Sequence, residues 1–529
     1  MTRIARRQLL GGAAALAALP APAIAAPDSA RTLRFIPQID LVFLDPHYSM
    51  TNITRNHAGL VFDMLYGTDA AFKAHPQMAE GHTVDNDGKL WRITLRENLW
   101  FHDGEPVLAR DCVASIKRWG KRDVLGAEVL AVSDEISAPD DRTIQFRLKT
   151  PFPMLPEALG KPGAYMPAML PARLAALDPF TQLPEIIGSG PFRYVANERL
   201  QGVRNVYAKF DKYVPRPSGT PDRGTGPKIV HFDRVIWTTM PDQGTALAAL
   251  QKGEQDWWEY ASQDVIPLVR KDKNLRYGVL ETEGNFGFVR FNHTQPPFNR
   301  PEMRRAILRA VNQEDFCAAV AGEAEFQRPG VGFYPPGLPD ATDVGLNTIR
   351  PPYTIDQARK ALEQAGYRGE KIVQITPGDY PNVKAASEVL ADLLQKIGIN
   401  LDNVTIDWAT MTQRVIKKDN PESGGFHLHM LNVPGLSVAS PLVNSRLRGV
   451  AASESGWYDS KRYEELRFQA ITTTDPAERK RLAGELQLEC LNTVPQVPTG
   501  VTLQPAAWRS DLEGVLLGVP KFWNVKRTA

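Results

Sequence analysis

Cysteine is scarce in this chain of 529 residues, which contains only three. Cys112, Cys317 and Cys490 lie far apart, so they form no CxxC pair and have no spacing typical of metal ligands. An odd number also excludes a framework in which every cysteine is paired within the chain. We expect three buried thiols that pack as small hydrophobic side chains, with one disulfide as the alternative.

The sequence also has little net charge and lacks the common catalytic motifs. Its formal net charge is +2 at pH 7, and the arginines of an N-terminal segment account for this small surplus. Such a balance argues against nucleic acid as a partner. The chain contains no GxSxG nucleophile elbow and no HExxH zinc motif, and its nine histidines are scattered. We therefore expect a protein that is not an enzyme and has no cofactor.

Long hydrophobic runs are missing after the N-terminal segment, so no stable membrane insertion is expected in the mature protein. Residues 1–25 themselves have the order of an export signal: arginines first, an apolar stretch at Leu9–Leu19, and small residues for cleavage near Ala25-Ala26. The adjacent Arg6 and Arg7 resemble a twin-arginine signal, with an ordinary secretory signal as the alternative. Both signals predict a periplasmic protein.

The most informative stretch is Trp91 to Trp119. Alternating apolar residues at its start predict a half-buried strand, His102 to Gly104 predicts a tight turn, and Pro106 to Trp119 predicts an amphipathic helix. The stretch resembles the signature of the family 5 extracellular solute-binding proteins of ABC importers, the large dipeptide, oligopeptide and nickel-complex binders. The matching residues are Asp87-Gly88, Leu95-Arg96, Phe101-His102-Asp103-Gly104, Pro106, Ala109 and Asp111.

This resemblance covers essentially the whole mature chain and implies its fold. We expect an α/β protein, a two-lobe periplasmic binding protein of type II with the large three-domain peptide-binder architecture, hinge strands and an interlobe cleft. The expected parts are the signal peptide 1–25, lobe I 32–70, an inserted domain 71–186, lobe I again 187–283, lobe II 284–497, and lobe I once more 498–529.

The resemblance also implies a function. The chain is expected to be a periplasmic substrate-binding component that captures a peptide or peptide-like solute. It would deliver that solute to ABC permease subunits in the membrane, which are driven by a cytoplasmic ATPase. We expect the protein to act as a monomer.

Local patterns give expectations for individual segments. Gly284–Asn292 and Val497–Leu503 are expected strands that pass between the lobes and form a hinge. Thr354 is the expected N-cap of a helix that ends at Ala365. Pro215–Lys228 is rich in proline and glycine, and therefore predicts an exposed loop.

Candidate ligand-binding residues are aromatic or polar positions expected to border the cleft. Aromatic faces suit apolar, aromatic or cationic solutes, although core packing is the alternative for each tryptophan. Glu259 and Asp264 lie among these aromatic residues and are more typical of solvated surface charge. The candidates are Trp257, Trp258, Tyr260, Trp408 at the end of an expected strand, Asn432, His429 and Tyr48.

The segment Phe426 to Pro441 departs from the family pattern. In peptide binders of this family, an aspartate in this region holds the α-amino group of the ligand. Here Asn432 to Pro441 contains no carboxylate. Because an ammonium group in a closed cleft needs a partner, a non-peptide aromatic or anionic solute, or an opine, is the alternative to a peptide.

Two histidines in the same segment raise the question of a metal. His427 and His429 are at positions i and i+2 of an expected strand, a spacing that permits two metal ligands. No cysteine, aspartate or glutamate lies close to them in sequence. We expect no metal site, and a nickel or metal-chelate receptor is the minority alternative.

Overall fold

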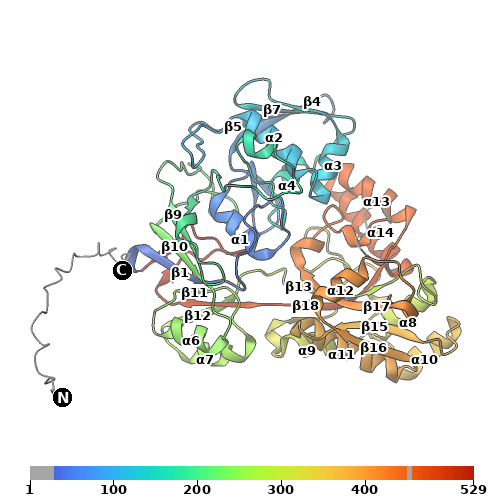
Figure 1. The fold of residues 1–529 in the computed structure, drawn as a ribbon. Coiled ribbons are helices and arrows are strands. Elements are labelled where there is room, and N and C mark those ends of the chain that lie inside the picture. The colour runs from blue at the N-terminus through green and yellow to red at the C-terminus, as the bar shows by residue number, and fades with distance from the viewer. Residues whose placement is uncertain (1–28, 450–454, 529) are drawn as a thin grey trace, which may run out of the picture.

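The computed structural model describes residues 29–449 and 455–528 (Figure 1). The expected signal peptide therefore lies outside the described residues. Three large sheets organise the fold: a seven-stranded and a six-stranded sheet lie side by side, and a four-stranded sheet lies above them in Figure 1. No helix in the described part of the chain is long and apolar enough to cross a membrane.

The seven-stranded sheet is assembled from segments that are distant in sequence. β1 is parallel to β10 and β11, and the other pairings are antiparallel. Side chains alternate between its faces, so Phe35 packs against helix α1 (Asn52–Val61) and Ile36 packs beside α6 (Gln243–Gln251) and α7 (Ile266–Lys271). The strand order is β12 (Leu275–Val279), β19 (Pro505–Arg509), β11 (Trp257–Trp258), β1 (Thr32–Ile36), β10 (Arg234–Thr238), β9 (Arg204–Lys209) and β8 (Phe192–Tyr194).

The six-stranded sheet forms the core of the second lobe. Its order is β14 (Gln327–Arg328), β18 (Gln496–Thr502), β13 (Asn285–Phe291), β17 (Leu428–Pro434), β15 (Ile372–Pro377) and β16 (Leu401–Ile406). The helices of this lobe are α8 (Pro301–Ala310), α9 (Gln313–Ala321), α10 (Ile355–Gln364), α11 (Pro381–Lys396), α12 (Trp408–Val415), α13 (Lys461–Thr472) and α14 (Pro476–Thr493). Thr354 caps α10 as expected, because its side chain accepts a hydrogen bond from the Gln357 amide.

The four-stranded sheet has the order β4 (Ala79–Asp85), β5 (Leu90–Leu95), β7 (Thr143–Leu148) and β6 (Ser133–Ser137). Helices α2 (Ala109–Trp119) and α3 (Val124–Val132) pack on this sheet, while α4 (Leu155–Leu159) packs beside α3 and α5 (Ala172–Ala175) beside α2. The expected strand, turn and helix of residues 91–119 are present, and the helix begins at Ala109, three residues later than expected. Two small hairpins complete the strands: β2 (Tyr66–Thr68) with β3 (Ala74–Pro76), and β20 (Leu512–Glu513) with β21 (Lys526–Arg527).

The chain passes between the two main sheets twice, as expected. β12 leads into β13 through residues 280–284, and β18 leads into β19 through Leu503 and Gln504. Figure 1 shows β13 and β18 running across toward the seven-stranded sheet. The three cysteines are buried free thiols, as expected. One strand boundary was wrong: Trp408 is the first residue of α12 and does not end a strand.

Candidate functional site

Two small adjoining cavities lie where the two main lobes meet the region of the four-stranded sheet. The first, the Lys521 cavity, has a volume of about 30 Å³ and is lined by α1, by residues 160–166, by Arg223 and by residues 518–521. The second, the Glu157 cavity, has a volume of about 80 Å³ and lies beside α4. Thr68, Pro162 and Leu436 border both cavities, which places the two against each other.

Leu436 brings the second lobe to this site. It lies in the short helix η7 (Gly435–Val438), which directly follows β17 and belongs to the segment that lacks carboxylates. The Gly435 amide donates to the carbonyl of Gly284 at 2.7 Å. A Cβ atom at position 435 would lie 2.2 Å from the carbonyl oxygen of Glu283, so only glycine permits this close approach. Helix η7 is therefore held close to residues 283–284, in the link between β12 and β13.

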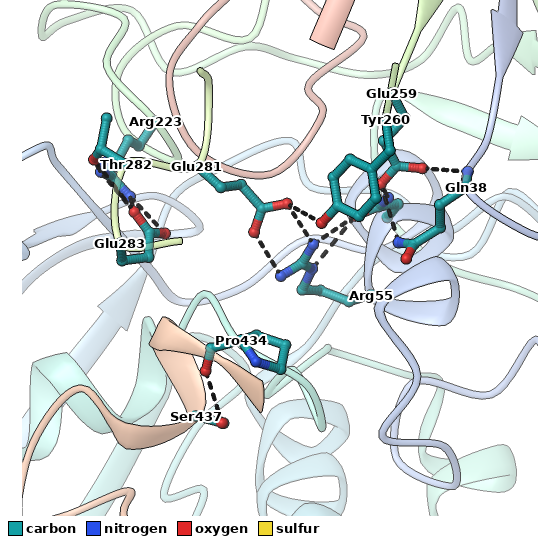
Figure 2. Close-up of polar contacts among 11 residues, drawn as sticks. Gln38, Arg55, Arg223, Glu259, Tyr260, Glu281, Thr282, Glu283, Pro434 and Ser437 are labelled. Carbon is teal, nitrogen blue, oxygen red and sulfur yellow. Dashed lines mark hydrogen bonds and ion pairs between the residues drawn. The ribbon is translucent and has the colours of Figure 1, made fainter. Parts of the chain in front are cut away.

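The link between β12 and β13, residues 280–284, carries two ion pairs that are mostly shielded from water (Figure 2). The Glu281 carboxylate accepts two hydrogen bonds from Arg55, each at 3.0 Å, and a third from the hydroxyl of Tyr260 at 3.1 Å. The terminal nitrogens of Arg223 donate to the Glu283 carboxylate at 3.2 Å. Both arginines line the Lys521 cavity, so each brings a paired positive charge to its wall.

Lys521 is the exception among these cations. Its side chain lies in the same cavity and the residue is only 8% exposed. Lys228 nearby is paired with Asp63 at 2.6 Å, whereas no carboxylate of the described residues is within ion-pair distance of the Lys521 ammonium. Burial, together with the positive charges around it, lowers the pKa of Lys521 to about 7.

Glu259 is buried, so the expectation that it is a solvated surface charge was wrong. Its carboxylate accepts a hydrogen bond at 2.8 Å from the backbone amide of Gln38 (Figure 2) and another from the side chain of Asn56. Burial raises the pKa of Glu259 to about 7. Asp264, by contrast, is exposed as expected.

The Glu157 cavity contains a carboxylate with an unused oxygen. Oε2 of Glu157 is buried and has no hydrogen-bond partner among the described residues. Burial raises the pKa of this carboxyl group. Two cations also line this cavity, and each has a carboxylate partner: Arg479 pairs with Asp340 at 2.9 Å, and Lys161 pairs with Asp123. The inserted region therefore offers a carboxylate to the space between the lobes.

The aromatic candidates of the first lobe divide between the core and this network. Trp257 is fully buried against Phe35, with ring centroids 5.3 Å apart. Trp258 is 2% exposed and packs in the hydrophobic cluster on the opposite face of the sheet. Tyr260 reaches the site through its bond to Glu281. Neither tryptophan borders the Lys521 or the Glu157 cavity.

The remaining aromatic and amide candidates lie elsewhere. The ring of Trp408 packs edge-on against Tyr380, with centroids 5.0 Å apart. Tyr48 contacts the Arg122 guanidinium, 5.5 Å from its ring centroid. Asn432 borders a separate cavity of about 10 Å³ inside the second lobe. The structure does not bring these three residues together.

The two histidines are engaged within the second lobe. Nδ1 of His427 accepts a hydrogen bond from the Val373 amide at 2.9 Å. His429 is fully buried, and burial lowers its pKa to about 3. Across the residues that the structure describes, no group of three histidine, cysteine or carboxylate side chains is placed to hold a metal ion.

The charged residues of the site were not among the sequence candidates. Arg223 and Lys228 come from the loop that was expected to be exposed, and that expectation was wrong for this half of the loop, where they are 5% and 4% exposed. Lys521 had a usable signal, because a single lysine stands among Val519, Phe522 and Trp523. An isolated charge within an apolar run is costly to bury and is therefore a candidate for function.

Two mixed α/β lobes, joined by two crossing strands and enclosing cavities between them, define a bilobal binding protein. Residues 73–428 match the model of the bacterial extracellular solute-binding proteins, family 5 Middle. The chain belongs to this family, as the resemblance of its sequence indicated.

Relatives with known names support the same class. The chain is 33% identical, over 99% of its own length and 99% of the relative, to a "Probable peptide ABC transporter periplasmic-binding protein y4tO" of Sinorhizobium fredii. It is 25% identical to the glutathione-binding protein GsiB of Escherichia coli K12, covering 92% of this chain and 90% of GsiB.

Solved structures share the fold. AgaA of A. tumefaciens R10 in complex with agropinic acid has a TM-score of 0.76 and 22% identity, covering 94% of this chain and 99% of AgaA. DppA of Helicobacter pylori in complex with the peptide STSA has the same TM-score, with 19% identity over 94% of this chain and 98% of DppA.

Proposed function

We propose that this member of the family is the periplasmic component of an ABC importer that captures a short peptide or peptide-like solute. It releases the solute to permease subunits in the membrane, which a cytoplasmic ATPase drives. The protein carries out no chemistry of its own and acts as a monomer. Export directed by residues 1–25, with cleavage near Ala25-Ala26, places it in the periplasm.

The observation that carries this proposal is the pair of cavities at the junction of the lobes. Their walls include residues of both lobes and of the inserted region, while only two strands join the lobes. Their volumes of about 30 and 80 Å³ are well below the several hundred Å³ of a typical ligand site. A peptide therefore enters when the lobes separate, and closure follows because closed-state contacts form around it.

The domain division expected from the sequence is part of this proposal. The expected division is lobe I at 32–70, 187–283 and 498–529, the inserted domain at 71–186, and lobe II at 284–497. Because β18 (Gln496–Thr502) belongs to the six-stranded sheet, we place the end of lobe II at Thr502. The hinge lies at the two crossings, where β12 joins β13 and β18 joins β19. Among the candidate residues, Tyr260 is the one whose position supports a role beside the solute, through its contact with Glu281.

A peptide solute also has a partner for its α-amino group. The second lobe offers no aspartate in Asn432 to Pro441, but Glu157 of the inserted region has an unpartnered carboxylate oxygen in the larger cavity. A charge-assisted bond to this oxygen replaces the missing aspartate. The names of the Sinorhizobium fredii relative and of GsiB are consistent with a peptide or a peptide-like solute.

A thermal-shift screen of the mature protein tests the proposal. The panel contains di-, tri- and tetraalanine, glutathione, an opine, aromatic acids and a nickel-histidine complex. A ligand at about 100 times its Kd adds roughly 2.7 kcal/mol of stability. We expect stabilisation by at least one peptide, and loss of that effect when its α-amine is acetylated. Stabilisation only by an opine or an aromatic acid would assign the protein to the non-peptide alternative.

A further inference from the structure

The Lys521 cavity is not electrically balanced. Arg55, Arg223 and Lys228 each have a carboxylate within 3.2 Å. Lys521 has no such partner among the described residues, although it is as well buried as the paired cations. When Lys521 is protonated, the wall of the cavity therefore carries one cation without a carboxylate partner. Burying an isolated ammonium is costly, which lowers its pKa, and a carboxylate bound beside Lys521 would favour the charged form again.

A second donor in the same cavity lacks an acceptor. The terminal nitrogens of Arg223 are occupied by Glu283 and by the hydroxyl of Thr282, but its Nε is buried and has no hydrogen-bond partner in the described chain. Arg223 is also held at φ 44°, a left-handed conformation that is unfavourable for a residue with a side chain. Such strain persists where the surrounding structure requires a particular placement, and it is often found at binding sites.

We propose that the Lys521 cavity binds a carboxylate group of the solute, which accepts hydrogen bonds from Lys521 Nζ and Arg223 Nε. This inference rests on the proposed solute-binding function and specifies the class of solute. Carboxylate is favoured over phosphate because a single cation lacks a partner and the cavity is small. Leu436 closes the cavity from the second lobe, so water is excluded from the pair only when the lobes are together.

The two adjoining cavities together define the orientation of a bound peptide. A carboxylate at Lys521 and an ammonium at Glu157 lie in adjoining cavities that share Thr68, Pro162 and Leu436. A short zwitterionic peptide fits this arrangement, with its C-terminus toward the first lobe and its N-terminus toward the inserted region. An acid without an α-amine uses the Lys521 cavity alone.

The experiment compares free acids with their neutral amides. Isothermal titration calorimetry measures the Kd of di-, tri- and tetraalanine, of their C-terminal amides, and of hippurate, an aromatic acid without an α-amine. The proteins are the wild type, Lys521→Met, Lys521→Arg and Lys252→Met. Lys252 is an exposed lysine of the same lobe and serves as the matched control. Circular dichroism establishes that each variant is folded.

We expect the wild type to bind a free acid at least about tenfold more tightly than its amide, a loss typical of an unpaired buried charge. Lys521→Met should reduce this preference to less than about threefold, while Lys521→Arg and Lys252→Met should retain it. The Met variant removes a buried charge without removing volume, so it is expected to fold.

The outcomes separate this inference from the proposed function. Equal binding of peptide acids and amides by the wild type and Lys521→Met would overturn the carboxylate site and leave peptide capture intact. Binding of hippurate but of no peptide, with loss in Lys521→Met, would support the carboxylate site and overturn the peptide proposal. Failure of every free acid in the panel to bind the wild type would overturn the carboxylate site.

Discussion

Two segments of the first lobe contain residues whose burial is the reverse of what their composition predicted. The aromatic segment Gly253–Asp264 was expected to line the cleft, yet Trp257 and Trp258 are both buried in hydrophobic clusters. The loop Pro215–Lys228 was expected to be exposed, yet it places Arg223 at a cavity between the lobes. The two tryptophans find hydrophobic neighbours in the fold, and Arg223 finds a carboxylate, so each becomes buried for a different reason.

A tryptophan and an arginine are buried under different conditions. A tryptophan gains free energy wherever it is removed from water, so a sheet with two covered faces readily takes it into its core. A guanidinium is costly to bury unless acceptors accompany it, and the carboxylate of Glu283, in the link between β12 and β13, provides them for Arg223. The ion pair therefore holds the loop against the link between the two main sheets, where Arg223 lines the Lys521 cavity.

The largest expected effect tests the core role of Trp257. Trp257→Ala should lower the free energy of unfolding by about 3–5 kcal/mol, because it leaves a cavity beside Phe35. Urea denaturation measures the loss, and Phe180→Ala, which changes a ring that is 62% exposed, is the control. A stable Trp257→Ala protein that no longer binds its solute would instead place this ring at the ligand.

The next effect tests the anchoring of the loop. Glu283→Gln leaves the Arg223 guanidinium buried without its counter-ion and should cost about 3 kcal/mol. Urea denaturation at pH 7 measures the change, with the exposed Glu254→Gln as the matched control. A loss no greater than that of the control would show that the pair does not hold the loop in place.

The third prediction concerns the pH dependence of the free energy of unfolding and its change when Lys521 is replaced. Because its folded pKa is lowered to about 7, the unfolded chain binds more protons than the folded chain between pH 7 and about 10. The contribution of Lys521 to stability therefore rises with pH in this window, by about 2 kcal/mol at most between pH 7 and 9. Arg55, Lys228 and Arg223 disfavour its charge and Glu281 favours it.

Urea denaturation at intervals from pH 6 to 9 measures this slope. The difference in stability between the wild type and Lys521→Met should grow in favour of the wild type as pH rises, whereas Lys252→Met should show no such trend. Glu259 has the opposite sign: its folded pKa is raised to about 7, so its contribution is lost as pH rises from about 4.5 through 7. A pH-independent difference for Lys521→Met would contradict the assignment of a buried ammonium.

The smallest effect concerns contacts between the inserted region and the second lobe. Glu128 of α3 pairs with Arg467 at 3.4 Å and with Arg448 at 3.6 Å. Glu128→Gln should weaken closure by about 1 kcal/mol, which lowers solute affinity by less than tenfold. Small-angle X-ray scattering of the solute-free protein should show a larger radius of gyration. Glu135→Gln, whose partner Arg147 lies in the same sheet, is the control and should not change it.

Local segments of the fold were predictable because their signals are local. The strand, turn and helix of residues 91–119 follow from alternation and from a helical apolar spacing, and both depend only on near neighbours. Thr354 caps its helix through an amide three residues away. The two crossings between the sheets were also expected, and they lie directly before β13 and directly after β18.

The site was less predictable because its partners are far apart in sequence. Arg55 meets Glu281 and Arg223 meets Glu283, from a helix and a loop that no local pattern links to the hinge. The aromatic composition of this segment predicted that Trp257 and Trp258 line the cleft. Composition does not show which face of a strand is covered by other parts of the protein. A buried charge cannot be identified from sequence alone, because its counter-ion is known only from the tertiary structure.

The sequence by itself determined the family, the α/β class and the order of the elements, because these depend on periodicity and on a local signature. Only the tertiary structure decided which groups form the cavities between the lobes. Burial and charge pairing act between residues hundreds of positions apart, and among the described residues they leave the buried Lys521 ammonium without a carboxylate partner. That unpaired charge, which depends on packing, is the basis for the acidic solute that we propose.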